Sequence, residues 1–291
     1  MIGGTPTSSK VGAPSGPRYP VDADSSARPR SPFLYHYTDW KGLRGIVTSR
    51  AIHLTHARFL NDKVEMLHGF EIVSNILSRI IDKSPAQRQK LLSRVKADWE
   101  KNFGDFNVFV SAFSERGDTL EQWRAYTPRG GCSIGFSSTE LRDAAHERNF
   151  WMLPCLYSAF RKRERLSKLL QLNENGFEQA GQNELEFFAD NVCSDFMVEI
   201  ARFKHFAFRS EREWRLFMFD NVLDHTDRLE FSARDSGLVP RLSLSFPVSA
   251  IKQIVLSPHS SLDTEFGAEW FLQAEGFQHV KVLHSRVPLR A

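Results

Sequence analysis

Two carboxylates stand inside an apolar, aromatic stretch at residues 206–219, whose sequence is FAFRSEREWRLFMF. If its second half forms a strand, Glu211 and Glu213 point to the same face, because side chains alternate along a strand. Burying carboxylates in such a strand is costly unless they are paired or serve a site. The stretch therefore predicts either a functional pair of glutamates or an ion pair between Glu213 and an arginine such as Arg212 or Arg215.

Composition favours a globular protein, because 291 residues with 41% hydrophobic content can bury a substantial core. No stretch reaches the roughly 18 to 20 apolar residues of a membrane span, and the start lacks the apolar core of a secretion signal. The cysteines Cys132, Cys155 and Cys193 are scattered without metal-ligand spacing, as expected for reduced thiols. We therefore expect a cytoplasmic protein without membrane contact and without a metal. Its net charge of +3 permits contact with nucleic acid but does not require it.

The chain divides into a tail and one domain. Residues 1–31 are rich in Gly, Pro, Ser and Ala, so they cannot offset the entropy of ordering and are predicted to be a disordered tail. Residues 32–291 are predicted to form a single domain. Helical insertions are expected within it at about residues 62–101 and 158–204, where apolar residues recur at helical spacing.

Periodicity predicts an α+β fold with a mixed sheet. Strands are predicted at residues 33–38, 51–56, 106–113, 130–136, 150–157, 211–219, 228–232, 241–246, 251–256 and 279–284. Helices are predicted at residues 39–50, 64–80, 84–101, 117–126, 137–147, 158–204 with a break near Asn175, and 262–275.

Polar side chains gather at three places along these strands. The clusters are His36, Tyr37 and Thr38 on the first strand; Ser111, Ser114, Trp123 and Tyr126 in the middle; and Glu211 and Glu213 late in the chain. Each lies at a strand end or a strand-to-helix turn, where sites are commonly built. Structural alternatives stay open, because a lone strand histidine is most often a hydrogen-bonded structural residue and an aromatic pair three apart most often packs a helix. Likewise, Asn61 and Asp62 could bond a ribose or an acceptor, although such a pair before a helix is more often a cap.

Several motifs resemble those of a widespread family of bacterial domains of otherwise unknown function. They are LYHYT, ARFLND, FSERGDTLEQWRAY, GGCSIGF, FRSEREWRL, IVLSPHSS and SRVPLR. Together they cover nearly all of the chain after the tail.

The order of the polar clusters is similar to that of the ADP-ribosyltransferase superfamily, in its branch of toxins and poly-ADP-ribose polymerases. There a first-strand histidine contacts NAD, a tyrosine stacks on nicotinamide and a glutamate bonds the nicotinamide ribose. The resemblance assigns these roles to His36, Tyr126 and Glu213. It also implies a split, mixed or antiparallel sheet core of ADP-ribosyltransferase type, flanked by the helical insertions.

The pair Glu211 and Glu213 also resembles the E-x-E motif of the arginine-modifying branch, in which the upstream glutamate orients the acceptor. The first-strand arginine and the S-T-S motif of that branch are absent, so the resemblance does not extend to arginine as acceptor. It implies that both glutamates are catalytic and that other polar residues bind NAD. These residues are His36, Tyr37, Thr38, Ser114, Trp123, Tyr126, Asn61 and Asp62.

The resemblance implies an NAD-dependent ADP-ribosyltransferase that cleaves the nicotinamide–ribose bond and transfers ADP-ribose to a macromolecule, either nucleic acid or protein. Glu213 could stabilise the developing oxocarbenium ion, and an aromatic face could hold the cationic nicotinamide. A bacterial toxin or an antiviral (phage-defence) effector is the role that such transferases suggest at the level of fold analogy. No glycine-rich nucleotide loop occurs in the sequence.

Two alternatives remain open. An NAD glycohydrolase would use water as the acceptor. An inactive module would bind a nucleotide or nucleic acid, in line with the basic residues Arg161, Lys162, Arg163 and Arg165.

Overall fold

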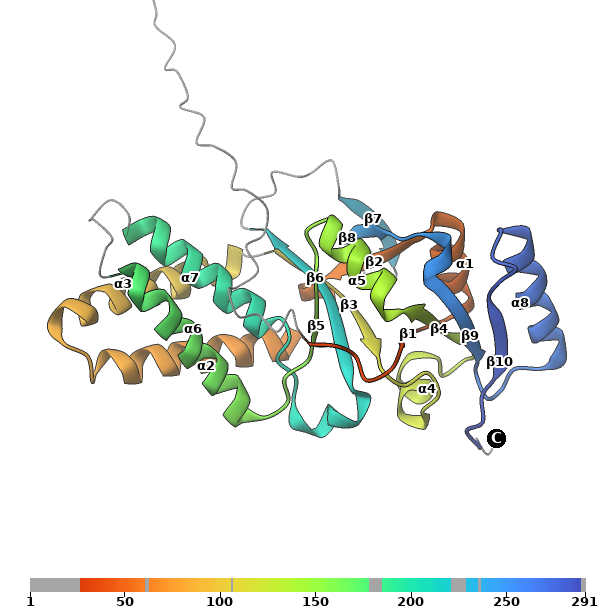
Figure 1. Ribbon diagram of the computed structural model, residues 1–291, viewed down its shortest axis with the longest axis horizontal. Helices are drawn as coiled ribbons and strands as arrows, with labels where there is room; N and C mark the ends of the chain where they lie inside the picture. The colour runs from red at the N-terminus through yellow and green to blue at the C-terminus, as the bar shows by residue number, and fades with distance from the viewer. Residues whose placement is uncertain are drawn as a thin grey trace, which may run out of the picture.

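The computed structural model describes residues 27–60, 63–105, 107–177, 185–220, 229–234 and 237–288. Most of the predicted tail, together with Asn61 and Asp62, lies outside these residues. Within them the chain is an α+β protein whose mixed sheet is mostly antiparallel, so the predicted class is confirmed (Figure 1). No helix of the described residues is both long and apolar enough to cross a membrane.

Short strands alternate with helices along the chain. The strands are β1 (Phe33–Thr38), β2 (Ala51–His56), β3 (Asn107–Ser114), β4 (Cys132–Ser137), β5 (Trp151–Pro154), β6 (Glu213–Asp220), β7 (Glu230–Arg234), β8 (Gly237–Ser245), β9 (Ile251–Leu256) and β10 (Lys281–His284). The helices are α1 (Trp40–Ser49), α2 (Lys63–Ile81), α3 (Ala86–Asn102), α4 (Leu120–Tyr126), α5 (Ser138–Glu147), α6 (Ala159–Phe177), α7 (Leu185–Ile200) and α8 (Leu262–Ala274).

The strand predicted from residue 211 begins two residues later, at Glu213. Residues Phe206–Glu211 instead form a 3₁₀ helix, η3, which ends at Arg212 with a left-handed φ of 46°. Since a left-handed residue breaks the alternation of side chains, Glu211 and Glu213 are not two positions of one strand face.

Strand β3 holds the sheet together. Along its whole length one edge pairs with β6, from Asn107↔Asp220 to Ser114↔Glu213. The other edge is shared, because β1 pairs with β3 at Tyr35↔Ser114 and β2 pairs with it at Val110 and Phe109. Strands β1 and β2 therefore diverge along one edge of β3. Beyond β1 the order continues through β4 and β9 to β10, and beyond β2 it continues through β8 to β7.

Each sheet face is covered by its own core. On one face, Leu34, Phe113 and Trp214 pack with the apolar sides of α1, α5 and α8. On the other face, Val110 and Phe217 pack with α2, α3, α6 and α7. Figure 1 shows these four helices gathered at one end of the molecule. The two predicted helical insertions thus form one layer, in which α3 and α6 both contact α7.

Candidate functional site

A row of side chains crosses three neighbouring strands on the face that also carries Val110 and Phe217. Tyr35 of β1 lies opposite Ser114 of β3, which lies opposite Glu213 of β6. Residues directly opposite each other in antiparallel strands share a face, so these three side chains lie on the same side of the sheet. The strand register thus brings Ser114 of the middle cluster together with Glu213 of the late cluster. On the first strand, the residue in this row is Tyr35, which was not among the predicted site residues.

Glu213 is the centre of a buried network of charges. Its carboxylate is 4% exposed and accepts from Arg215 Nε at 2.6 Å through Oε1 and from Lys204 Nζ through Oε2. The Cys155 thiol lies 3.6 Å from Oε1, and the backbone N–H of Glu213 donates to the Tyr157 hydroxyl at 2.8 Å. The ion pair with Arg215 is the structural alternative that the sequence predicted.

Lys204 joins the two glutamates, because its Nζ also lies 3.0 Å from Glu211 Oε2. Burial opposes ionisation of Glu213, but the charges of Arg215 and Lys204 outweigh it and lower its pKa to about 2. Burial raises the pKa of Glu211, and Lys204 offsets this only in part. The two carboxyl groups thus share one cation but have opposite pKa shifts, so Glu213 is the more firmly ionised of the two.

His36 lies on the opposite sheet face from this network. It follows Tyr35 in β1, so its side chain alternates to the side of Phe113, whose ring centroid is 5.4 Å away. Its Nδ1 lies 2.9 Å from the Ala112 carbonyl and donates to it. Burial lowers the pKa of His36, although this hydrogen bond raises it. These contacts fit the structural alternative, and they do not bring His36 together with Glu213. Thr38, at the end of the same strand, pairs with Cys132 of β4.

Tyr37 and Trp123 hold the loop that follows β3. Their rings meet edge to face with centroids 4.8 Å apart. The Tyr37 hydroxyl donates to the Arg116 carbonyl at 3.0 Å and accepts from the Thr119 N–H at 3.3 Å. Trp123 Nε1 donates to Asp118 at 2.7 Å. Both aromatic residues are buried and pack against each other.

Ser114 connects this loop to η3. Its buried hydroxyl donates to the Glu211 carbonyl at 2.6 Å and accepts from the Arg116 N–H at 3.0 Å. Tyr126, in contrast, stands at the end of α4 and is 44% exposed. Of the predicted site residues, the structure therefore places Ser114, Glu211 and Glu213 in contact. Tyr37 is linked to Ser114 through Arg116, to which both hydroxyl groups bond.

Lys204, Tyr157 and Cys155 complete the network, and none of them was predicted to belong to the site. Arg215 could be predicted from the sequence as a partner of Glu213, because it lies two positions later on the same strand and therefore on the same face. Lys204 carries no such signal, since its place beside both glutamates depends on the turn formed by η3.

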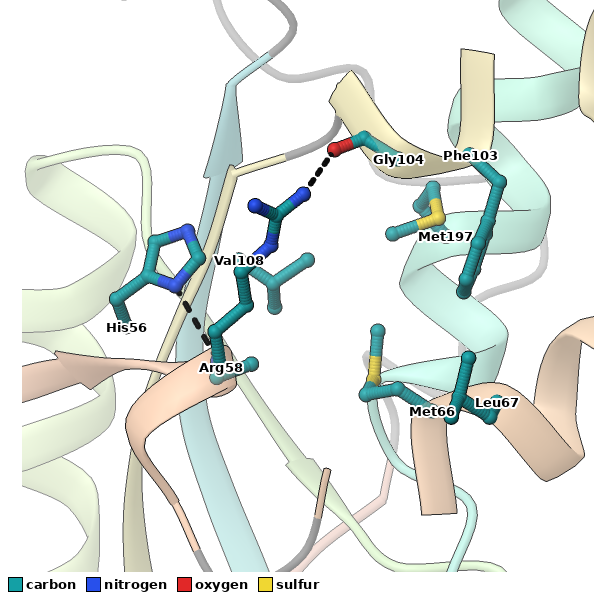
Figure 2. Close-up of a pocket in the computed structure, with 9 residues that line it drawn as sticks. His56, Arg58, Met66, Leu67, Phe103, Gly104, Val108 and Met197 are labelled. Atoms are coloured by element: carbon teal, nitrogen blue, oxygen red, sulfur yellow. Dashed lines mark hydrogen bonds between the residues drawn. The ribbon is translucent and has the colours of Figure 1, made fainter. Parts of the chain in front are cut away.

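A separate pocket of about 310 Å³ lies between the sheet and the helical layer (Figure 2). Its lining is His56, Ala57, Arg58, Met66, Leu67, Phe103, Gly104, Val108 and Met197. Both nitrogens of His56 are engaged, by the Arg58 N–H and by Asn107 Oδ1, each at 3.2 Å. Arg58 reaches across to donate to the Gly104 carbonyl at 2.6 Å. None of the predicted site residues lines this pocket.

Within the described parts of the chain, no three His, Cys, Asp or Glu side chains are grouped as metal ligands would be. The three cysteines are free thiols and buried.

Residues 122–216 match a family model described as "Protein of unknown function (DUF2971)". The match begins in α4 and ends in β6, so it contains Tyr126, Lys204, Glu211 and Glu213. A domain of unknown function is therefore present, over a shorter part of the chain than the motifs suggested. Neither the curated proteins nor the solved structures contain a significant match to the chain.

Proposed function

We propose that the protein is an NAD-dependent ADP-ribosyltransferase in which Glu213 is the catalytic residue and Glu211 a second polar contact. The observation that carries this proposal is the row from Tyr35 through Ser114 to Glu213, which aligns the three motif-bearing strands on one face. The sequence resemblance supplies the reaction class. His36 has no part in the proposal because its imidazole lies on the other face, and the stacking role of Tyr126 stays a prediction.

The ionisation of Glu213 supports this role. When the C–N bond between nicotinamide and ribose breaks, nicotinamide leaves with the electron pair and positive charge develops on the ribose. A nearby carboxylate stabilises that charge only if it is ionised. Because Arg215 and Lys204 lower its pKa to about 2, Glu213 is an anion at neutral pH. The acceptor then forms a bond to the ribose carbon and loses its proton.

Because the Glu213 carboxylate is buried and both of its oxygens already accept from a cation, a ribose hydroxyl would reach it by replacing one of these donors. Lys204 is the donor that can be replaced, because Glu211 offers its ammonium group a second carboxylate at 3.0 Å. Arg215 is held more firmly, since its NH1 also donates to the Ala201 carbonyl at 2.9 Å. Lys204 would thus pass to Glu211 when NAD binds.

A second candidate is a nucleotide-binding module without turnover. It is favoured by the fact that both Glu213 oxygens are already engaged by cations of the same chain, as in a structural ion pair. An NAD glycohydrolase would use the same groups with water as acceptor. The toxin or phage-defence role belongs to the transferase proposal and is no more specific than the fold analogy.

The test is release of nicotinamide from NAD by the purified protein, with labelled NAD offered together with cell lysate, RNA and DNA. Glu213→Asp and Glu213→Gln are expected to lose turnover. Glu199→Gln is the matched control, because Glu199 is also a buried carboxylate paired with two arginines, Arg202 at 2.9 Å and Arg165 at 2.8 Å.

Turnover that is lost in both Glu213 variants but kept in folded Glu199→Gln supports catalysis by Glu213. Equal loss in all three variants would mean that the effect follows from stability. Binding of NAD without release favours the nucleotide-binding module. Release without label on any macromolecule favours the glycohydrolase.

A further inference from the structure

The 3₁₀ helix η3 presents two aromatic side chains to solvent next to the glutamate pair. Phe206 is 55% exposed and Phe208 is 46% exposed, within three positions of each other. The turn is well defined, because the His205 side chain accepts from the Ala207 N–H at 3.2 Å and Arg212 ends it in the left-handed region. The exposed rings are therefore held on an ordered backbone.

Phe206 and Phe208 each make a cation–π contact. The Arg209 guanidinium lies over Phe206 at 4.4 Å from the ring centroid, and Lys204 Nζ lies 5.2 Å from the centroid of Phe208. Arg209 is itself exposed. Such cation–π contacts orient an arginine flat on a ring, where it leaves its N–H groups free to face a ligand.

The start of α6 lies beside η3. Leu156 forms a bridge with Phe203, and the Lys204 N–H donates to the Leu156 carbonyl at 3.1 Å. Lys162 is buried rather than solvated, and its Nζ donates to the Lys204 carbonyl at 2.7 Å, so it ties the two segments together. Phe160 in the first turn of α6 is also exposed, but it lies two positions before Lys162 and therefore on the side of the helix away from η3. Arg161 and Arg163, which flank Lys162 in the sequence, are exposed.

More arginines border η3 from the opposite side. The Glu115 N–H donates to the Arg212 carbonyl at 3.2 Å, which joins the loop after β3 to the end of η3. Arg116 in that loop and Arg212 are both exposed. Two acidic groups beside η3 are occupied, since Glu211 faces Lys204 and Glu115 accepts from Trp214 Nε1 at 3.2 Å, while Glu164 next to Arg163 is exposed.

We give the name aromatic–arginine surface to the exposed rings and arginines of η3 and to the exposed arginines of the two segments joined to it. They are Arg161, Arg163, Phe206, Phe208, Arg209, Arg212 and Arg116. In Figure 1 the η3 segment, where the chain passes from α7 into β6, lies along the lower edge.

We infer that the aromatic–arginine surface binds single-stranded nucleic acid. Exposed rings offer stacking platforms for unpaired bases, and the arginines between them match a phosphate backbone. A duplex cannot use the rings, because its bases are already stacked. Another exposed apolar stripe, formed by Leu262, Phe266 and Trp270 on α8, lies among Asp263, Glu265 and Glu269 and lacks this positive charge.

The inference does not require NAD cleavage. If the proposed function holds, it identifies single-stranded nucleic acid as the acceptor, because η3 ends at Glu211 and β6 begins at Glu213. The bound strand would then lie beside the carboxylates.

The test is fluorescence anisotropy with labelled oligouridine, oligothymidine and a duplex, without NAD. Replacing both Phe206 and Phe208 by alanine is expected to weaken single-strand binding about 30-fold or more, because two stacked bases are lost. Arg209→Glu should also lower the salt dependence of binding by about one phosphate contact. Because all three side chains are exposed, these variants should keep the thermal unfolding curve of the parent protein.

The matched controls carry the same changes on α8 and α1. Phe266→Ala with Trp270→Ala removes two exposed rings, and Arg44→Glu reverses an exposed charge, so both are expected to bind as the parent does. Equal weakening in tests and controls, absence of single-strand binding at low salt, or duplex binding as tight as single-strand binding would each overturn the inference. The RNA and DNA arms identify the preferred strand. Since the assay contains no NAD, its failure is distinct from failure of the NAD-release assay.

Discussion

Replacing Glu213 by glutamine tests the charge network at the centre of the candidate site. Glutamine keeps the size of the side chain but removes the charge that Arg215 and Lys204 face. Arg215 and Lys204 are both buried, so neither can turn to water when the carboxylate is lost. We therefore expect a large loss of stability.

The magnitude follows from the pKa of Glu213, which the network lowers from an ordinary value of 4.5 to about 2. At about 1.4 kcal/mol for each pH unit, the ionised form contributes about 3 kcal/mol to folding. This agrees with the roughly 3 to 5 kcal/mol lost when one member of a buried ion pair is removed. Glu213→Gln should therefore lower the free energy of unfolding by about 3 kcal/mol at pH 7.

The pH dependence has a defined sign. A carboxyl group with a lowered pKa in the folded state contributes stability above its unfolded pKa and loses that contribution as the pH falls through the folded pKa. The difference between parent and Glu213→Gln should thus be constant above about pH 5 and shrink as the pH falls from 4.5 towards 2.

Urea unfolding at a series of pH values measures this difference directly. Glu140→Gln is the control, because Glu140 pairs with Lys252 at a partly exposed site and should cost below about 1 kcal/mol. A loss at Glu213 no larger than at Glu140, or a difference that grows on acidification, would refute the reasoning.

Other predictions concern the loop after β3 and the last helix. Tyr37→Phe removes the hydroxyl that donates to Arg116 and accepts from Thr119, so urea unfolding should show a loss of about 1 to 2 kcal/mol and the loop amides should exchange faster. A stability equal to the parent would contradict the loop-anchoring role. Gly117→Ala places a methyl group 2.3 Å from the Tyr35 ring, so the melting temperature should fall, by an equivalent of about 1 to 3 kcal/mol. Gly45→Ala, with nothing within 4 Å, is its control. Ser261→Ala breaks the capping box of α8 and should cost about 1 kcal/mol in chemical unfolding, whereas no change would mean that the cap contributes nothing.

Local periodicity predicts most of the helices and strands, because the spacing of apolar residues that marks each one lies within a short run of consecutive residues. It failed at Glu211, where a single left-handed residue, Arg212, separates a 3₁₀ turn from the strand. A positive φ at arginine has no reliable sequence signal. The two glutamates are not on one strand face, but the turn still brings both of them beside Lys204.

The composition of the site depends on register, which a sequence does not display. Alternation alone separates His36 from Tyr35 and Tyr37 on β1. Glu213 lies on the sheet face of Tyr35, not on that of His36, because of the pairings Tyr35↔Ser114 and Ser114↔Glu213. The second pairing joins strands that are far apart in the chain, so no local pattern could place Glu213 with Tyr35 rather than with His36.

The position of β3 between early and late strands also orders events during synthesis. Its terminal residue Ser114 bonds to the Glu211 carbonyl, 97 positions later in the chain. At roughly 5 to 20 residues per second, a ribosome needs about 5 to 20 s to cover that distance. During that interval one edge of β3 has no β6 to pair with, while β1 and β2 are already available. The pairing of Ser114 with Glu213 can therefore form only after β1, β2 and β5 have been made, at a stage when β7 to β10 are still to be synthesised.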